Sequence, residues 1–365
     1  MYNRFLALLA GAGLILAASA TIPAHAQEAS VAGATAPFLP SAMRLSGLSP
    51  VYQQINRCSA AALTMQLSYF QWDGNYDRTI HYLNPHSEDM AVRLDEMASF
   101  AELQGLRAVA RTGGTVQLLK ELVASGFPVL VENSYFDGAD GFNDWMGHNR
   151  VIMGYNDADG VLLSFDSLLG NGENNQGRPI PYDDMDSRWR TFNRDYLVLY
   201  RPEDEGRLQE VLGDQWDTVA NAEFTLRMSE SEIQLDHADG FTYFNMGSSL
   251  VDLGRFEEAA AAFDQAFEMG LPWRMLWYQY APFEAYFQVG RYDDVIRLAN
   301  ETLSTTHGVE EMYYYLGLVY EQLGDMQRAE GNMEAAIWRN ENYTAAIDAL
   351  ARMRGEPTPT PEPGT

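Results

Sequence analysis

The sequence predicts two folded parts: an α+β domain made of an N-terminal helix and an antiparallel sheet, then an all-α domain of helical repeats. Two observations predict the first part. An Ala-rich helical stretch begins at Cys58, the only cysteine of the 365 residues, and short β-branched segments separated by turns follow it. One observation predicts the second part, because a pattern of glycine and aromatic residues recurs from about residue 241 onward.

The N-terminus has the features of a secretory signal peptide. Arg4 precedes an apolar run over 6–20, and an A-x-A cleavage pattern ends at Ala26. We therefore expect an exported chain, periplasmic or extracellular, with no membrane span after cleavage. The expected segments are a signal peptide (1–26), a coil leader (27–49), the α+β domain (50–202), a helical connector (203–240), the repeat domain (241–353) and a disordered Pro/Thr-rich tail (354–365).

Composition excludes several classes of function. The chain has 24 Lys and Arg against 51 Asp and Glu, a formal charge of −27, which disfavours nucleic acid and anionic membrane surfaces as partners. A single cysteine forms no intramolecular disulfide and no Cys-rich zinc site, and the six histidines show no metal-binding spacing. We expect no metal and no cofactor.

The α+β domain is justified element by element. Its helices are expected at 60–70, 89–104 and 115–125, and its strands at 129–132, 148–155, 161–166 and 196–200. The turn-prone residues 156–160 join the second and third strands into a hairpin. In that antiparallel register His148, near the start of one strand, lies beside Asp166, at the end of the other.

Cys58, His148 and Asp166 together suggest nucleophilic catalysis. At a helix N-terminus, unpaired N–H groups and the helix dipole favour a thiolate at Cys58, and an upstream glutamine could supply an oxyanion donor. His148 would deprotonate the thiol, and Asp166 would orient the imidazole. Each residue also has a structural interpretation: a small buried cysteine, a histidine at a strand start, and an acidic residue in a turn or cap.

The motifs around these residues resemble the papain-like C39 and C39-like cysteine peptidases over roughly residues 50–200. The matching positions are Gln53, Asn56 and Cys58; Gly126, Pro128 and Val129; Gly147 and His148; Gly154, Tyr155, Asn156 and Asp157; and Asp166. The resemblance implies a papain-like fold with Cys58 as nucleophile, His148 as general base and acid, Asp166 as the orienting residue and Gln53 as oxyanion donor. Gln54 is the alternative for that last role.

Two positions depart from the family pattern. Ser59 and Ala60 stand where Gly-Pro usually follows the cysteine, and Asn149 replaces the usual aromatic residue after the histidine. Neither change removes a catalytic side chain. The alternatives to a peptidase are therefore a degenerate domain that binds peptides without cleaving them and, with the triad intact, an acyl or amide transferase.

The second part resembles tetratricopeptide repeats. Gly254, Gly290 and Gly324 are spaced 36 and 34 residues apart, close to the length of one such helix pair. We expect three repeats, the middle one divergent, whose stacked helices bind a protein partner or substrate. An aromatic cluster over 273–287 is expected to be repeat core, with a peptide-binding groove as the alternative. The leading hypothesis is an exported cysteine peptidase that acts on a peptide or protein.

Overall fold

The computed structural model describes residues 39–86, 88–89, 91–135 and 144–357. The expected signal peptide and residues 358–365 of the expected tail lie outside these residues, and Arg354, expected to begin that tail, ends a helix instead. Within the described part of the chain, no helix has both the length and the apolar character needed to cross a membrane.

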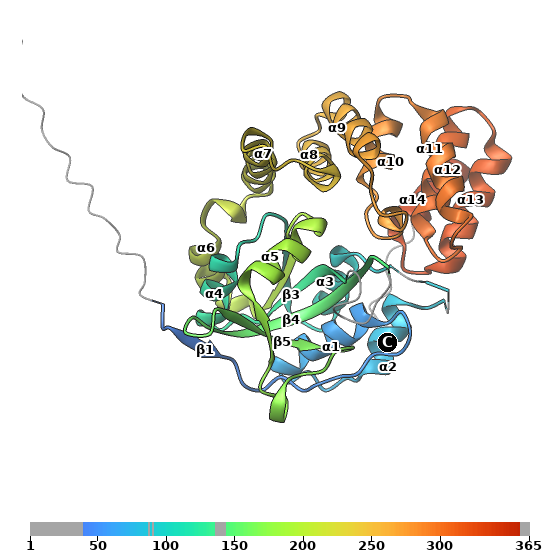
Figure 1. Cartoon of the computed structure of the whole chain (residues 1–365). Helices are drawn as coiled ribbons and strands as arrows, with labels where there is room; N and C mark the ends of the chain where they lie inside the picture. The colour runs from blue at the N-terminus through green and yellow to red at the C-terminus, as the bar shows by residue number, and fades with distance from the viewer. Residues whose placement is uncertain (1–38, 87, 90, 136–143, 358–365) are drawn as a thin grey trace, which may run out of the picture. The chain divides into compact units, whose positions relative to one another are not determined.

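One antiparallel sheet of seven strands forms the centre of the first domain, as expected (Figure 1). The strands are β1 (Ala42–Arg44), β2 (Arg107–Arg111), β3 (Val129–Tyr135), β4 (Met146–Asn156), β5 (Val161–Asp166), β6 (Arg178–Pro181) and β7 (Tyr196–Tyr200). Their order is β2-β7-β3-β4-β5-β6, and β1 pairs with the last residues of β4. The β4–β5 hairpin has the antiparallel pairing that the sequence predicted.

Helices bury both faces of this sheet. They are α1 (Cys58–Tyr69), α2 (Tyr76–Leu83), α3 (Leu94–Leu103), α4 (Val116–Ala124), α5 (Tyr182–Trp189) and α6 (Glu205–Leu212). Leu130 and Val151 belong to the core shared with α1 and α3, whereas their strand neighbours Val129 and Ile152 belong to the core shared with α4. Because successive strand residues point to opposite faces, the covered stretches 129–131 of β3 and 151–153 of β4 are apolar at every position.

Three differences from the sequence-based expectation have local causes. Residues 42–44 of the expected coil leader form β1, a strand too short to produce a recognisable pattern. The helix expected from residue 89 begins at Leu94, because the Arg93 amide donates to the Glu96 carboxylate in a capping box. Helices α2 and α5 and strands β2 and β6 were not predicted, since each has at most eight residues.

The second part is entirely helical and carries the yellow-to-red colours of Figure 1. Its helices are α7 (Thr218–Gln234), α8 (Gly240–Asp252), α9 (Phe256–Met269), α10 (Ala281–Gln288), α11 (Tyr292–Leu303), α12 (Glu310–Gln322), α13 (Met326–Arg339) and α14 (Thr344–Arg354). Three helix pairs, α8–α9, α10–α11 and α12–α13, correspond to the repeat units.

Glycines serve two purposes in these pairs. Gly254, Gly290 and Gly324 have φ of 69°, 75° and 78° at the turn within each pair, a left-handed conformation that favours glycine. Gly247 lies against Phe263, whose ring would be 2.6 Å from an added Cβ. The period of about 34 residues therefore reflects turn geometry and close helix packing. Most of the aromatic cluster is core, as expected, and only Trp273 is mainly exposed.

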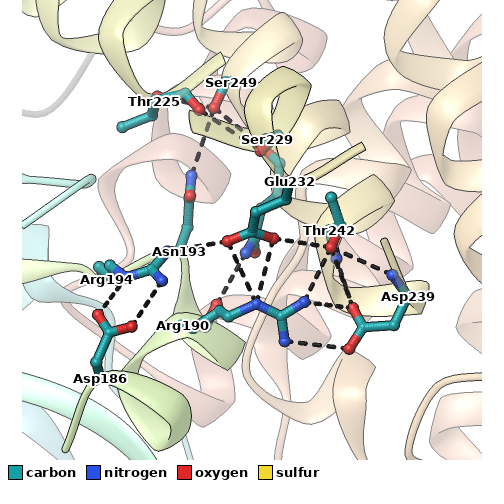
Figure 2. Close-up of polar contacts among 11 residues, drawn as sticks. Asp186, Arg190, Asn193, Arg194, Thr225, Ser229, Glu232, Asp239, Thr242 and Ser249 are labelled. Carbon is teal, nitrogen blue, oxygen red and sulfur yellow. Dashed lines mark hydrogen bonds and ion pairs between the residues drawn. The ribbon is translucent and has the colours of Figure 1, made fainter. Parts of the chain in front are cut away.

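An arginine-centred network joins α7 and α8 to the first domain (Figure 2). Arg190, from the short helix after α5, donates to Asp239 at 2.7 Å, to Glu232 at 3.2 Å and to Thr242 at 2.9 Å. Arg194 donates to Glu232 at 3.4 Å from the same side. These charge-assisted hydrogen bonds are only partly exposed to water, so they fix the start of the helical part against this segment.

We expect Arg190→Met to lower the free energy of unfolding by about 2–3 kcal/mol, since it leaves two carboxylates without their main donor. Urea unfolding measures the loss. Arg297→Met is the matched control, because Arg297 pairs only with Asp294 and Glu301 of its own helix, mostly in solvent. Arg297→Met should lower the free energy of unfolding by no more than about 0.5 kcal/mol. Equal losses in both variants would show that the Arg190 network does not join the two parts.

Candidate active site

Cys58 is the first residue of α1 and is half-buried. The turn before it depends on Asn56, whose φ of 57° is left-handed, a conformation that asparagine tolerates better than most residues. The Arg57 side chain is buried and donates to the backbone carbonyl of Asp89 at 2.7 Å, which ties this turn to the segment before α3. The thiol thus sits at the N-terminal end of a helix, as the sequence predicted.

His148 and Asp166 lie side by side on neighbouring strands. His148 Nε2 is 3.1 Å from Asp166 Oδ1, and both side chains are almost fully buried. Arg150 is paired directly opposite Asp166 across β4 and β5, and His148 is two residues from Arg150 on the same face. The other imidazole nitrogen is left for Cys58, whose thiol lies close enough to His148 for each group to shift the pKa of the other.

The Asp166 carboxylate is saturated with donors. The backbone amides of Leu168 and Leu169 donate to Oδ1 at 2.9 and 2.8 Å, and the Tyr135 hydroxyl donates to Oδ2. The Arg150 guanidinium lies 3.5 Å from Oδ2 and also donates to the Tyr135 hydroxyl. So many donors fix both the position and the ionised state of the carboxylate.

The charges of the three groups depend on one another. Burial raises the pKa of Cys58, but the hydrogen bond and positive charge of His148 outweigh it and lower the pKa below the usual thiol value. Burial lowers the pKa of His148, yet Asp166 and Cys58 together raise it to about 9. Burial also disfavours the Asp166 anion, whose pKa nevertheless lies well below its usual range because of His148 and Arg150. Both shifts favour the pair of a thiolate and an imidazolium over the neutral pair.

Gln53 and Gln54 differ in their surroundings. Gln53 is partly buried, and its side-chain carbonyl accepts a hydrogen bond from the Ser167 hydroxyl at 2.8 Å, next to Asp166. Its amide NH₂ makes no hydrogen bond within the described residues and remains available as a donor. Gln54 is exposed, and its hydrogen bonds involve only its backbone: its amide donates to the Tyr76 hydroxyl at 3.0 Å, and its carbonyl accepts from the Arg57 amide at 3.2 Å within the described residues. Gln53 therefore fits an oxyanion donor better than Gln54 does.

Comparison with known families identifies the two parts of the chain. Residues 48–197 match the Peptidase_C39 like family, and residues 244–279 and 310–343 each match a tetratricopeptide repeat. The chain contains a C39-like peptidase domain followed by tetratricopeptide repeats. The resemblance inferred from the motifs and the predicted fold class are confirmed. A comparison with curated proteins returned no match.

Solved structures similar to the chain fall into two groups. A putative C39-like peptidase from Bacillus anthracis aligns with 17% identity over 44% of this chain and 98% of its own, with a TM-score of 0.35. A double glycine motif protease from an AMS/PCAT transporter aligns with 18% identity over 44% and 94%, with a TM-score of 0.33. MamA from Desulfovibrio magneticus aligns with 16% identity over 42% and 81%, with a TM-score of 0.33.

One wall of the small pocket beside Cys58 is formed by a residue of the helical part. It is lined by Cys58, Ser59, Ala91, Val92, Arg93 and Glu132 of the C39-like domain and by Tyr278 of the helical part. About 10 Å³ is free, which is room for one water-sized group. A larger hollow of about 810 Å³ runs along β1 and β6 and contains none of the three triad residues. Tyr278 therefore helps to limit the free space beside Cys58.

The sequence patterns did not identify several residues that lie at the C39-like site. Arg150 could have been found, because it lies two residues after His148 and so shares its face of the strand. Tyr135 ends a strand without any motif, and Tyr278 lies in a different domain. Their proximity to the triad depends on tertiary packing that local patterns do not encode.

We expect Gly147→Ala to disturb this wall. An added Cβ would lie 2.9 Å from the Phe192 ring, 3.0 Å from the Tyr278 ring and 2.8 Å from the Glu132 carboxylate. Both rings are packed, so the free energy of unfolding should fall by about 1–3 kcal/mol, measured by urea unfolding. Gly206→Ala is the control, since an added Cβ there meets nothing within 4 Å. A Gly147→Ala protein as stable as the Gly206→Ala protein would contradict this packing.

Proposed function

We propose that the protein is an exported cysteine hydrolase that cleaves peptide bonds, with its tetratricopeptide repeats binding the substrate or a protein partner. The observation that carries the proposal is the hydrogen bond of His148 Nε2 to the buried Asp166 carboxylate, with the Cys58 thiol near enough to the same imidazole to interact with it. Export rests on the signal-like sequence that ends near Ala26. Cell fractionation with an antibody to the mature chain tests it, and retention of the intact chain in the cytoplasm would contradict it.

The proposed reaction follows from the charges of these groups. The Cys58 thiolate attacks the carbonyl carbon, and the resulting oxyanion accepts hydrogen bonds from the Cys58 backbone amide and the Gln53 amide group. Imidazolium at His148 then gives its proton to the leaving amine, which leaves a thioester. His148 next removes a proton from water, hydroxide attacks the thioester, and the acid product leaves as the thiol is regenerated. Asp166 keeps the imidazole oriented throughout.

A mixed peptide library tests the hydrolase directly. Library peptides are incubated with the purified protein, and new termini are identified by mass spectrometry. We expect cleavage by the wild-type chain and none by Cys58→Ala. Ser187→Ala serves as the control variant, because Ser187 is exposed on α5 and is not among the residues that line the pocket of Cys58, and it should retain cleavage. Equal cleavage by wild type and Cys58→Ala would exclude Cys58 as the nucleophile.

The pH dependence of cleavage should be bell-shaped. On the acid side activity requires the Cys58 thiolate, whose pKa lies below its usual value. On the alkaline side activity requires protonated His148, whose pKa is raised to about 9, so the rate should fall as the pH rises through that value. Initial rates on one cleaved peptide measure the profile. An alkaline limb near the ordinary histidine value of about 6.5 would contradict the ion pair.

A peptide-binding scaffold is the second candidate, and the small size of the pocket beside Cys58 favours it. In that case the domain would bind peptides without cleaving them, and the repeats would carry the main function. Binding of library peptides by wild type and Cys58→Ala alike, with no new termini in either, would support this candidate. New termini accompanied by transfer to added amines would instead indicate an acyl transferase.

A further inference from the structure

Four carboxylates gather where the C39-like domain meets α12. Glu310 and Glu311 form the first turn of α12, and Glu96 comes from α3. One carboxylate oxygen from each of these three lies within 4.8 Å of the others. Asp89, just before α3, is the fourth and interacts electrostatically with all three. Asp89, Glu310 and Glu311 are at most 2% exposed.

These carboxylates are not fully satisfied by the protein. Glu310 Oε2, Glu311 Oε2 and both oxygens of Asp89 are buried without a hydrogen-bond partner in the described residues. The backbone amides of Ala91 and of Glu311 lie close to Asp89 and Glu311 but do not meet full hydrogen-bond geometry. Unpartnered carboxylate oxygens are costly inside a protein, so their occurrence from two domains at one place points to a binding site for a cation.

The nearby positive charges do not balance the cluster. Arg93 reaches Glu311 at 2.5 Å and Glu96 at 3.9 Å, and it also pairs with Asp95. Arg57 is close enough to interact with Asp89, but its guanidinium donates to backbone carbonyls. Two guanidinium groups against four carboxylates leave an excess of two negative charges. The N-terminal dipole of α12 offsets only about half a charge.

We propose that Glu96, Glu310 and Glu311 bind a divalent cation of the calcium type between the two domains, with the Asp89 carboxylate beside them adding negative charge. Calcium takes six to eight oxygen ligands, mostly carboxylates and carbonyls, in a flexible geometry, and an all-carboxylate set suits it better than a transition metal. The Asn340 amide donates to Glu96 at 2.7 Å and to Glu310 at 2.8 Å. Asn340 thereby orients two of the proposed ligands through hydrogen bonds. Such hydrogen bonds to ligating side chains are usual around metal sites.

Such a cation would also hold the wall of the candidate active site. Arg93 lines the pocket beside Cys58, and the segment from Asp89 to Arg93 carries the carbonyl that Arg57 binds. Linking this segment to Glu310 and Glu311 would fix it against the helical part. Cation binding is therefore expected to stabilise the full chain independently of any peptidase activity.

Calcium titration of the full chain tests the proposal. The chain is stripped with EDTA, exchanged into chelator-free buffer with 0.15 M NaCl as an ordinary ionic strength, and titrated calorimetrically with CaCl₂ and separately with MgCl₂. We expect saturable binding of one calcium, weaker binding of magnesium and a higher thermal midpoint with calcium. Absence of calcium binding at millimolar concentration would overturn the proposal. The negative charge of the cluster would then be neutralised by protons bound to its carboxylates.

A pair of matched variants locates the site. Glu310→Gln with Glu311→Gln should weaken calcium binding at least ~10-fold, since it removes two ligands. Glu257→Gln with Glu258→Gln makes the same charge change in the exposed first turn of α9 and should bind calcium like the wild type. If the first double variant does not fold, Glu96→Gln alone should show the loss. Unchanged affinity in the ligand variants would overturn the assignment.

Discussion

Replacing His148 with alanine should slow alkylation of Cys58 by iodoacetamide at pH 7 roughly 30-fold or more. Without the imidazolium, burial is the largest remaining influence on the thiol and raises its pKa, and a thiol with a pKa near 8.5 is only about 3% ionised at pH 7. His148→Gln tests the same point while keeping a side chain that can donate to Asp166. The rate is measured by mass spectrometry of the single cysteine.

His237→Ala is the control for this experiment, because His237 is exposed in the loop between α7 and α8. Its alkylation rate should equal that of the wild type. Circular dichroism of each variant shows whether the fold is retained. A rate for His148→Gln equal to that of the wild type, in a folded protein, would mean that the imidazole does not activate the thiol.

Replacing Asp166 with alanine should lower the free energy of unfolding by about 3–5 kcal/mol. The change leaves His148 and Arg150 buried without their shared counter-charge and removes the acceptor of the Leu168 and Leu169 amides. Asp166→Asn should cost less, because the amide carbonyl still accepts hydrogen bonds. Urea unfolding at pH 7 measures both changes.

The control for Asp166 is Asp157→Ala, because Asp157 also pairs with a cation, Lys120, but at the surface. Its loss should stay within about 1 kcal/mol. The difference in free energy of unfolding between the wild type and Asp166→Ala should also depend on pH. The pKa of Asp166 is depressed in the folded state, so its contribution is complete above about pH 4, the unfolded value, and disappears as the pH falls below it. Equal losses in Asp166→Ala and Asp157→Ala would contradict the buried network.

The sequence predicted the elements with strong periodicity or a tight turn. The β4–β5 hairpin follows from Asn156 to Gly160, and the helix at Cys58 and the helix pairs follow from apolar spacing and glycine turns. The Peptidase_C39 like match agrees with the motifs around Cys58 and His148. Domain boundaries, catalytic roles and export remain predictions.

What the sequence could not predict depends on contacts between distant residues. Nothing near Tyr278 in the chain indicates that it lines the pocket of Cys58, since the two residues meet only after the helical part packs on the sheet. The carboxylates of Asp89 and Glu310 likewise come together from segments more than two hundred residues apart. Short strands such as β1 were missed because three residues carry too little pattern to predict pairing.

The pH dependence of Cys58 alkylation in the wild-type chain tests the central claim, an activated thiol, most directly. Because His148 lowers the pKa of Cys58, we expect the rate to reach half its plateau clearly below the free-thiol value of about 8.5. A half-maximal rate at or above about 8.5, or no reaction until the protein is unfolded, would contradict a catalytic Cys58.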